Sequence, residues 1–471
     1  MQSAVLISTL ARYQTVFWIP VAQALRRLGH EPAFLTFDDP SDGLIRRAGL
    51  TSFNAFTLGS KGTPAGAPAL ERELEERLGW TLPLAVSHER ITFGLHDTPA
   101  LGEKLARHRA AAAAALGELR GAGPLTVVQE LGGFLSVIGT FLAARAAGRD
   151  NLFLEPAFFR GRFFATRNTF AAPRVGRAGR QEAVDADAVK HMEAAHAARA
   201  IVIPTKDRHH YTAATRKVVN LKNIRRLAGK LYEKYGQRQR HEFGYVGAYV
   251  ASHARMVRNS VLLRRSYTPL RHGQPFVYYP LHVPADAALT LRAPHYLDQL
   301  SLVDYLARIV PASHRLVIKE HPAQVGALDA RRLRDLLARH DNLSLLPPTV
   351  NNYDALAGCD LVVSINSKSG AEALVLGKPV LVLGDAFYAD SGLVTPVGNA
   401  AELPQALRAA LNNPAAPAKD DVERFFSRVW RATQPGELYV ADEDNAGTFA
   451  RSIHLAVVNS AQPEVASSRS A

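Results

Sequence analysis

Polar residues that suit a phosphate group follow a short apolar run within the stretch 360–388. A turn with hydroxyl, amide and lysine side chains, Lys368 among them, leads there into a predicted helix that begins near Gly370. Hydroxyls, a cation and free backbone N–H groups at the positive end of a helix favour a phosphate, and Glu372 in the first turn would accept hydrogen bonds from a ribose. The residues predicted to bind at this turn are Ser364, Asn366, Ser367, Ser369, Gly370 and Glu372. They also fit a plain helix start, with Ser367 or Ser369 as the N-cap and Glu372 as its capping-box partner.

A second candidate site is the tetrapeptide Lys319, Glu320, His321 and Pro322, which follows the apolar run Arg315–Ile318. Pro322 fixes the loop and prevents an early helix start, so Lys319 and His321 are expected at the carboxyl end of a strand. Beside a lysine and facing a phosphate-type turn, His321 would stabilise a departing phosphate. Taken alone, the histidine is equally compatible with a structural role.

Two carboxylates, Glu130 and Glu155, come at the ends of successive predicted strands in the first half of the chain. If the two strands are neighbours, the carboxylates face one site, and a pair of carboxylates is what a glycosyl-transfer centre needs for a base and a nucleophile. Alternatively, each pairs with a nearby arginine such as Arg160, Arg162 or Arg167. The residue types alone leave both readings open.

The elements that position these residues follow a repeated strand–helix–strand rhythm, first near the N-terminus and again from Pro275. We therefore predict an α/β protein with two doubly wound domains, whose ligands bind at the carboxyl ends of the strands and in the cleft between the domains. The predicted units are an N-terminal α/β domain (1–205), a basic helical segment (206–270), a C-terminal α/β domain (271–412), helices that pack back (413–460) and a disordered tail (461–471).

Nearly all of the formal net charge of +13 lies in residues 206–265, which have a net charge of +12. Basic residues recur there at helical spacings between apolar ones, as expected for amphipathic helices with one basic face. This face is either simply solvated or docks an anionic partner, such as lipid headgroups or an acidic glycan. The residues chosen for the docking role are Lys222, Arg225, Arg226 and Lys230.

Other function classes lack support in the sequence. The single cysteine, Cys359, excludes a disulfide framework and a multi-cysteine metal site. No apolar run is long enough to span a membrane, and Met1–Leu10 reads as a buried strand rather than a signal peptide. There is no nucleic-acid motif, no Walker loop, no Gly-x-Gly-x-x-Gly and no metalloprotease motif. We expect a cytoplasmic protein, peripheral on the inner membrane at most, without a metal, a cofactor or a nucleic-acid partner.

Several ordered motifs in the second half resemble the capsule polysaccharide biosynthesis proteins, a family that includes the retaining β-Kdo glycosyltransferases of capsule assembly. The motifs are Tyr279-Pro-Leu-His282, Ile318-Lys-Glu-His-Pro322, Ser364-Ile-Asn-Ser-Lys-Ser-Gly-Ala-Glu372, Gly377-Lys-Pro-Val380 and Leu383-Gly-Asp-Ala-Phe-Tyr388. A looser match is Phe153-Leu-Glu-Pro-Ala-Phe-Phe-Arg160. Where those transferases have Glu-acidic-Gly, this chain reads Glu155-Pro156-Ala157.

The resemblance implies a GT-B fold and a CMP-activated acidic sugar, Kdo, as donor, with a glycan or glycolipid acceptor. It also implies that residues 1–205 form the acceptor or catalytic domain and residues 271–412 the nucleotide-sugar-binding domain. Carried over to this sequence, Lys319, His321, Ser367 and Ser369 would meet the phosphate and Glu372 would hold the ribose. Glu155, Glu130 and His321 are then the catalytic candidates. Two alternatives stay open, namely a non-catalytic export or assembly protein that binds the glycan, and a nucleotide-sugar epimerase of similar shape.

Overall fold

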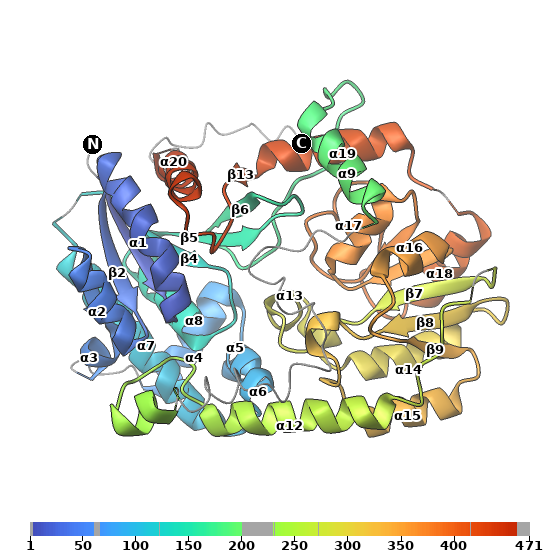
Figure 1. The fold of residues 1–471 in the computed structure, drawn as a ribbon, viewed down its shortest axis with the longest axis horizontal. Helices are drawn as coiled ribbons and strands as arrows, with labels where there is room; N and C mark the ends of the chain where they lie inside the picture. The colour runs from blue at the N-terminus through green and yellow to red at the C-terminus, as the bar shows by residue number, and fades with distance from the viewer. Residues whose placement is uncertain are drawn as a thin grey trace.

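Two α/β domains lie side by side in the computed structural model of the chain, each built on one sheet (Figure 1). The structure describes residues 3–60, 66–121, 123–199, 229, 231–271, 273–414 and 416–458.

The first sheet has seven strands in the order β3-β2-β1-β4-β5-β6-β13. Strands β1 to β5 pair in parallel, whereas β6 is antiparallel to β5 and β13 is antiparallel to β6. The strands are β1 (Ala4–Thr9), β2 (Glu31–Thr36), β3 (Thr51–Asn54), β4 (Leu125–Glu130), β5 (Asp150–Pro156), β6 (Arg162–Arg167) and β13 (Gln434–Pro435).

The second sheet has six strands in the order β9-β8-β7-β10-β11-β12, and all of its pairs are parallel. These strands are β7 (Phe276–Pro280), β8 (Arg315–Lys319), β9 (Leu343–Leu346), β10 (Leu361–Ser364), β11 (Val380–Val382) and β12 (Thr395–Pro396). The strand order reverses between β1 and β4 in the first sheet and between β7 and β10 in the second, as in a Rossmann fold. Ligands of such sheets bind at the point of reversal.

Both faces of each sheet are buried, which explains why the strands read as continuous apolar runs. In β1, Ala4 and Leu6 face one hydrophobic cluster while Val5 and Ile7 face another. On the first sheet, helices α7 and α8 cover one face and α1 and α20 the other. The helices of this half are α1 (Arg12–Arg27), α2 (Asp39–Arg47), α3 (Ala55–Gly59), α4 (Ala67–Leu78), α5 (Leu82–Ala85), α6 (Ser87–Phe93), α7 (Thr98–Glu118), α8 (Leu135–Ala146) and α20 (Glu443–Val458).

The second sheet is covered in the same way, with helices α14, α15 and α18 on one face and α16, α17 and α19 on the other. Its helices are α13 (Ala287–Thr290), α14 (Gln299–Ile309), α15 (Ala330–Arg339), α16 (Asn352–Gly358), α17 (Lys368–Val375), α18 (Leu403–Asn412) and α19 (Lys419–Ala432), with 3-10 turns at Pro294–Tyr296 and Pro322–Gln324. Helix α9 (Ala186–Ala197) packs against α19.

One long helix, α12 (Val246–Leu263), runs beneath both domains (Figure 1) and contacts α6 of the first and α15 of the second. A π-helical turn (Tyr232–Gly236) precedes it. The predicted α/β fold with two doubly wound domains is confirmed, as is the GT-B-like arrangement of two Rossmann-like domains. The sequence reading missed β3, β6, β12 and β13, because β12 and β13 have only two residues each and β3 and β6 contain no clear apolar run.

Candidate functional site

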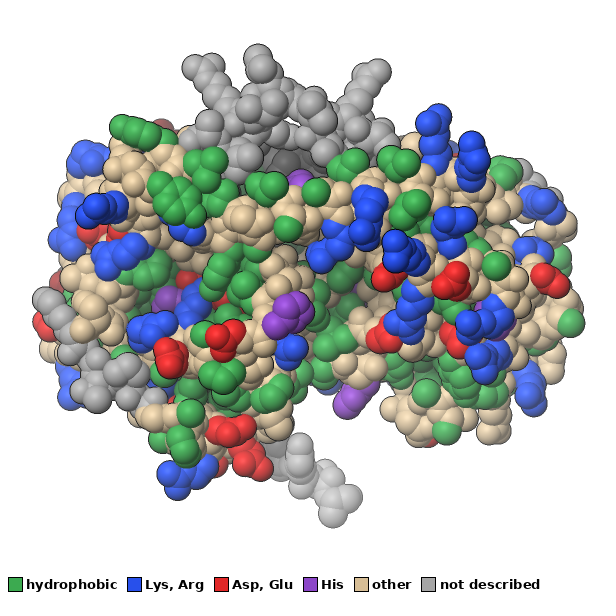
Figure 2. Space-filling view, turned by 90° about the horizontal axis from the view of Figure 1, so that it is seen from below, with side chains coloured by type: hydrophobic (Ala, Val, Ile, Leu, Met, Phe, Trp, Pro, Cys, Tyr) green, Lys and Arg blue, Asp and Glu red, His purple; other side chains and the backbone are tan. Residues whose placement is uncertain are grey.

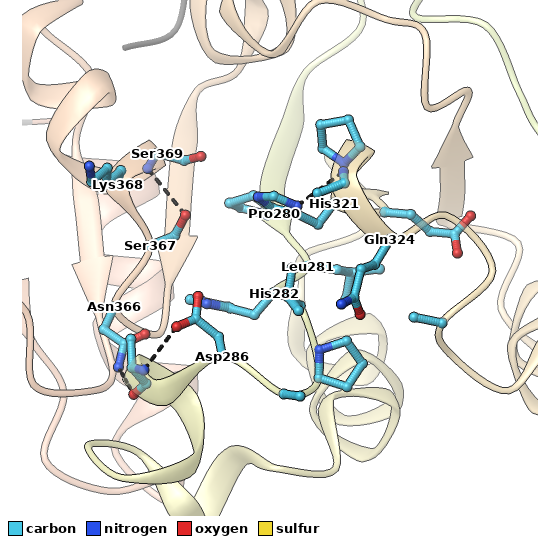
Figure 3. A pocket seen from close by; sticks show the side chains of 18 of the residues that line it. Pro280, Leu281, His282, Asp286, His321, Gln324, Asn366, Ser367, Lys368 and Ser369 are labelled. Atoms are coloured by element: carbon cyan, nitrogen blue, oxygen red, sulfur yellow. Dashed lines mark hydrogen bonds between the residues drawn. The ribbon is translucent and has the colours of Figure 1, made fainter. Parts of the chain in front are cut away.

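A cavity of about 700 Å³ lies between the two domains and is lined by both of them and by α12. On the side of the second domain it lies at the carboxyl ends of β7, β8 and β10, which is the point where the strand order reverses. Figure 3 shows the side chains that these strand ends bring together. The sheet topology therefore brings the two candidate sites of the second domain into one cavity.

The turn between β10 and α17 begins the helix through Ser367, whose Oγ accepts a hydrogen bond from the backbone N–H of Ser369 at 3.2 Å. Lys368 Nζ donates to the carbonyl of Ala157 in the first domain at 2.9 Å. Asn366 Nδ2 donates to the carbonyl of Ala288 at 2.6 Å, while its Oδ1 is buried without a partner among the described residues. Asn366, Ser367 and Ser369 all line the cavity, as predicted for a ligand-binding turn, and Ser367 is also the N-cap.

Two residues predicted for this turn do not line the cavity. Ser364 is fully buried and its hydroxyl pairs with the hydroxyl of Tyr388 at 3.1 Å. Gly370 packs against the same tyrosine so tightly that a Cβ would lie 2.2 Å from the phenol oxygen. Both residues therefore shape the turn from behind rather than binding a ligand.

Glu372 and Lys319 carry opposite charges on the cavity wall, and burial shifts both pKa values toward neutrality. Burial raises the pKa of Glu372 to about 7, against a hydrogen bond from Asn352 and the charges of Lys368 and Lys319. Glu372 Oε2 accepts from Asn352 Nδ2 at 3.1 Å, and Oε1 has no partner among the described residues. Burial lowers the pKa of Lys319 to about 8, although the Glu372 charge opposes this shift.

His321 follows Lys319 at the end of β8, and its Nδ1 accepts the backbone N–H of Ala323 at 3.3 Å. When Nδ1 accepts, the proton of the neutral ring lies on Nε2. Pro322 begins the short 3-10 turn behind it and also lines the cavity. The loop thus holds a histidine N–H donor beside the lysine.

Glu320 borders the cavity, but its carboxylate organises the loop. Its Oε2 accepts from Tyr267 at 2.8 Å and its Oε1 from the backbone N–H of Gly326 at 2.8 Å, and burial raises its pKa. Both oxygens are engaged, so the nucleotide-binding role predicted for Glu320 is replaced by a positioning role.

The structure does not bring Glu130 and Glu155 together. Glu130 is aligned with Leu154 across the β4–β5 pair, and successive side chains of a strand point to opposite faces, so Glu155 points away from Glu130. Glu130 accepts from Gln14 at 3.1 Å and from Tyr439, outside the cavity. The expectation that the two carboxylates share one site is therefore not met.

Glu155 lines the cavity, but it is held by Arg292 of the second domain. Two guanidinium nitrogens of Arg292 donate to its carboxylate at 2.7 and 3.0 Å, and the same arginine also donates to the carbonyls of Phe170 and Ala171. The nearby arginines considered from the sequence, Arg160, Arg162 and Arg167, have other partners. A bidentate ion pair across the cleft was not predictable, because the partners are 137 residues apart.

The sequence reading also left His282 without a role. His282 lines the cavity after β7, its Nε2 is buried without a partner among the described residues, and burial lowers its pKa, although the charge of Asp286 opposes this shift. Figure 3 shows its ring on the same side of the loop as Asp286 and Asn366. The sequence signal that could have identified His282 is its position two residues after β7, a parallel strand that pairs with β10.

The four residues predicted for docking, Lys222, Arg225, Arg226 and Lys230, lie outside the described residues. Within the described ranges, no group of three or more histidine, cysteine, aspartate or glutamate side chains is arranged to hold a metal ion. None of the described helices combines the length and the apolar character needed to cross a bilayer.

Comparison with known proteins finds similarity in the middle and later parts of the chain. Residues 185–412 match the family described as capsule polysaccharide biosynthesis protein. Protein FixF of Sinorhizobium fredii is 32% identical over 133 residues, which are 28% of this chain and 32% of FixF. The chain thus matches about a third of the length of that curated relative.

Solved structures of low similarity include a transferase and an epimerase. The β-Kdo 2,7 transferase KpsC of Thermosulfurimonas dismutans has a TM-score of 0.36 and 17% identity, covering 74% of this chain and 89% of that one. The UDP-GlcNAc 2-epimerase of Methanocaldococcus jannaschii has a TM-score of 0.31 and 13% identity, covering 90% of this chain and 98% of that one. Likeness at this level says nothing about the substrate of this chain.

The motifs around Lys319, His321 and Glu372, which line the cavity, all fall inside the matched range. The resemblance drawn from the sequence is confirmed as a match: residues 185–412, just under half of the chain, are similar to the capsule polysaccharide biosynthesis protein family.

Proposed function

We propose that the chain is a glycosyltransferase of capsule polysaccharide biosynthesis that transfers an acidic sugar, Kdo, from its CMP derivative to a glycan acceptor. The observation that carries this proposal is the cavity at the strand-order reversal of the second domain. Lys319, His321 and the start of α17 line it together with Glu372. The family match over the same residues supports a role in capsule assembly.

The phosphate of the donor would bind between Lys319, His321 and the N-terminus of α17. During transfer the bond from the anomeric carbon to the phosphate oxygen breaks, that carbon becomes bonded to the acceptor oxygen, and the proton of the acceptor hydroxyl passes to a base or to water. The nucleotide leaves with the electron pair, so negative charge grows on the phosphate. A lysine, a histidine N–H and backbone N–H groups at a helix start stabilise such a charge.

The ribose would bind to Glu372, whose free Oε1 is an acceptor suited to a hydroxyl group. A buried acceptor without a partner costs free energy in the empty protein, and a ligand hydroxyl would remove that cost. Asn366 Oδ1 offers a second such acceptor nearby on the same turn.

A donor screen tests the reaction. Purified protein is incubated with CMP-Kdo, CMP-sialic acid or UDP-sugars and a capsule-type acceptor, and release of CMP or UDP is measured. We expect CMP release from CMP-Kdo that depends on the acceptor. Turnover of a UDP-sugar without CMP release would overturn the donor assignment.

A non-catalytic glycan-binding protein is the second candidate, and the Arg292–Glu155 pair favours it, because the ion pair engages the first-domain carboxylate that lines the cavity. Glu155→Gln discriminates between the two. A transferase that uses Glu155 as a nucleophile or base loses turnover, whereas a binding protein keeps its glycan affinity. Glu130→Gln serves as the comparison, since Glu130 lies outside the cavity.

We also propose that the chain works in the cytoplasm at the inner membrane, where a peripheral contact with lipid or with the export machinery would bring it to its acceptor. The net charge of +12 in residues 206–265 supports this placement. Neutralising Lys222, Arg225, Arg226 and Lys230 tests it, and unchanged membrane association at low salt would reject it.

A further inference from the structure

Part of the cavity wall belongs to neither sheet. Helix α12 contributes Tyr249, Ser252, His253, Arg255 and Met256, and the proposed donor contacts use none of them. Each of the five lies three or four residues from another of them, so they form one stripe along the helix. The proposed donor site therefore uses the cavity residues at the strand ends, and the residues of α12 that line the cavity have no assigned function.

The α12 wall has the chemistry of a carbohydrate site. Tyr249 and Met256 offer apolar surface for the C–H groups of a sugar ring, and Ser252 and His253 offer polar groups for its hydroxyls. Tyr249 packs on Phe93 of the first domain, with ring centroids 5.7 Å apart, so the wall is continuous with both domains.

Arg255 gives this wall a positive charge, and none of the α12 residues that line the cavity is acidic. Arg255 is exposed on the cavity side and makes no ion pair with any residue that the structure describes. Figure 2 views the face on the α12 side and shows lysine and arginine side chains among hydrophobic ones.

The acidic side chains that line the same cavity come from other elements, and most of them are engaged. Arg292 holds Glu155, Tyr267 and Gly326 hold Glu320, and Arg174 pairs with Asp385 at 2.9 Å. The ion pairs that these carboxylates make are with arginines outside α12.

The wall is also rigidly placed. Asn259 Nδ2 donates to the carbonyls of Gly326 and Leu328 at 2.9 and 2.8 Å, which fixes α12 to the loop that follows His321. At Gly326 a Cβ would lie 2.2 Å from the carbonyl oxygen of Met256, so only glycine permits this approach. The α12 wall and the proposed phosphate site therefore keep a fixed relation to each other.

We propose that the α12 wall, with Arg255 as its anionic anchor, is the subsite for the acceptor, a glycan that carries carboxylates. This assignment rests on the proposed transferase function, because it names the site of the second substrate. The acceptor chain lies along α12, and its terminal sugar points to the donor site at the strand ends.

Binding of two tetrasaccharide probes tests the subsite. Tetragalacturonate carries a carboxylate on every sugar and maltotetraose carries none, and both are titrated calorimetrically against the full chain. We expect the wild type to prefer tetragalacturonate, and Arg255→Gln to weaken that binding by about tenfold, as for the loss of one charged hydrogen bond. Arg258→Gln is the matched control, because it removes the same charge from an exposed position of α12 outside the cavity.

Two results would overturn the proposed subsite. One is an equal loss of tetragalacturonate affinity in Arg255→Gln and Arg258→Gln, and the other is equal affinity of the wild type for maltotetraose and tetragalacturonate. Affinity for CMP is measured in the same variants and should not change with Arg255→Gln. If the wild type binds tetragalacturonate through Arg255 but neither binds nor turns over a CMP-sugar, the donor assignment fails while the glycan subsite stands. Recovery of tetragalacturonate affinity in Arg255→Lys would show that the charge carries the effect.

Discussion

Lys319 and Glu372 titrate close to neutral pH, and donor binding should report both. Glu372 has a pKa of about 7 and accepts ribose hydroxyls best when ionised, so affinity should rise as the pH increases through 7. Lys319 has a pKa of about 8 and must be charged to attract the phosphate, so affinity should fall above that value. We expect the affinity for CMP-Kdo, whose phosphodiester does not titrate in this range, to be maximal between about pH 7 and 8.

Calorimetric titration across pH 5.5 to about 9.5 measures this profile. Glu372→Gln keeps an acceptor oxygen without a titrating group, so the variant should lose the acidic limb and retain the alkaline one. A flat profile in the wild type would contradict the assignment of both groups.

His321 should act on the leaving phosphate rather than on the fold. Its ring is oriented by the backbone N–H of Ala323, which donates to Nδ1, so the proton of the neutral ring lies on Nε2. We expect His321→Ala to lower turnover by roughly two to four orders of magnitude, the range for a key electrostatic group. Steady-state kinetics measure the loss, and an unchanged melting temperature shows that the fold is intact; a near-normal rate would reject the role.

At the scale of elements, the start of α17 depends on the contact between Gly370 and Tyr388. The Tyr388 hydroxyl donates to the carbonyl of Ser367 at 2.6 Å, and Gly370 leaves the space for it. We expect Gly370→Ala to destabilise the protein by about 1 to 3 kcal/mol, as overpacking does, and to weaken CMP binding by displacing the turn. Thermal unfolding and calorimetry measure the two effects.

Gly117→Ala is the matched control for that substitution, because Gly117 lies in α7 with open space where the Cβ would be placed. There the change should stabilise the protein slightly, through helix propensity and a less flexible unfolded chain. If both variants behave alike, the contact with Tyr388 has no special role.

The loop after β8 depends in the same way on Glu320. Glu320→Ala leaves the hydroxyl of Tyr267 and the N–H of Gly326 without their acceptor, which costs about 1 to 3 kcal/mol for each group. Glu320→Gln retains one carbonyl oxygen and should lose less stability. Chemical denaturation measures the free energy of unfolding of both variants. Equal losses of stability in the two would argue against the two hydrogen bonds.

The strands that carry the site residues also explain which parts of the site could be predicted from the sequence. Both candidate sites of the second domain lie in one cavity because parallel strands end at one edge, and this rule works from sequence alone. The rule failed for Glu130 and Glu155, because the register of β4 and β5 decides which face each side chain takes. Glu320 looked like a ligand contact, since its partner Tyr267 is 53 residues away and only the fold brings it close.

At the scale of the whole molecule, the Arg292–Glu155 pair ties the two domains together across the cavity. The Arg292 side chain is 7% exposed and that of Glu155 is 18% exposed, so removing one partner leaves a poorly solvated charge, at a cost of about 3 to 5 kcal/mol. We expect Arg292→Gln to lower the melting temperature and to widen the distribution of distances between spin labels placed on the two domains. Electron paramagnetic resonance measures those distances.

Arg174→Gln is the control for that measurement, since Arg174 pairs with Asp385 while its side chain is 62% exposed. An exposed pair contributes little, so both the distances and the stability should stay close to those of the wild type. If Arg292→Gln has no larger effect than this control, the ion pair does not hold the domains.

One edge strand of the first sheet and one of its covering helices follow the second domain in the sequence, because β13 pairs with β6 and α20 packs on α1. During synthesis every strand of the second domain is therefore made before β13 and α20 complete the first domain. Until residues 434–458 emerge, the edge of β6 and the apolar side of α1 lack their partners, whereas the strands of the second domain are already present. The second domain should thus fold first during synthesis, and a chaperone would bind the exposed apolar surface of the first domain.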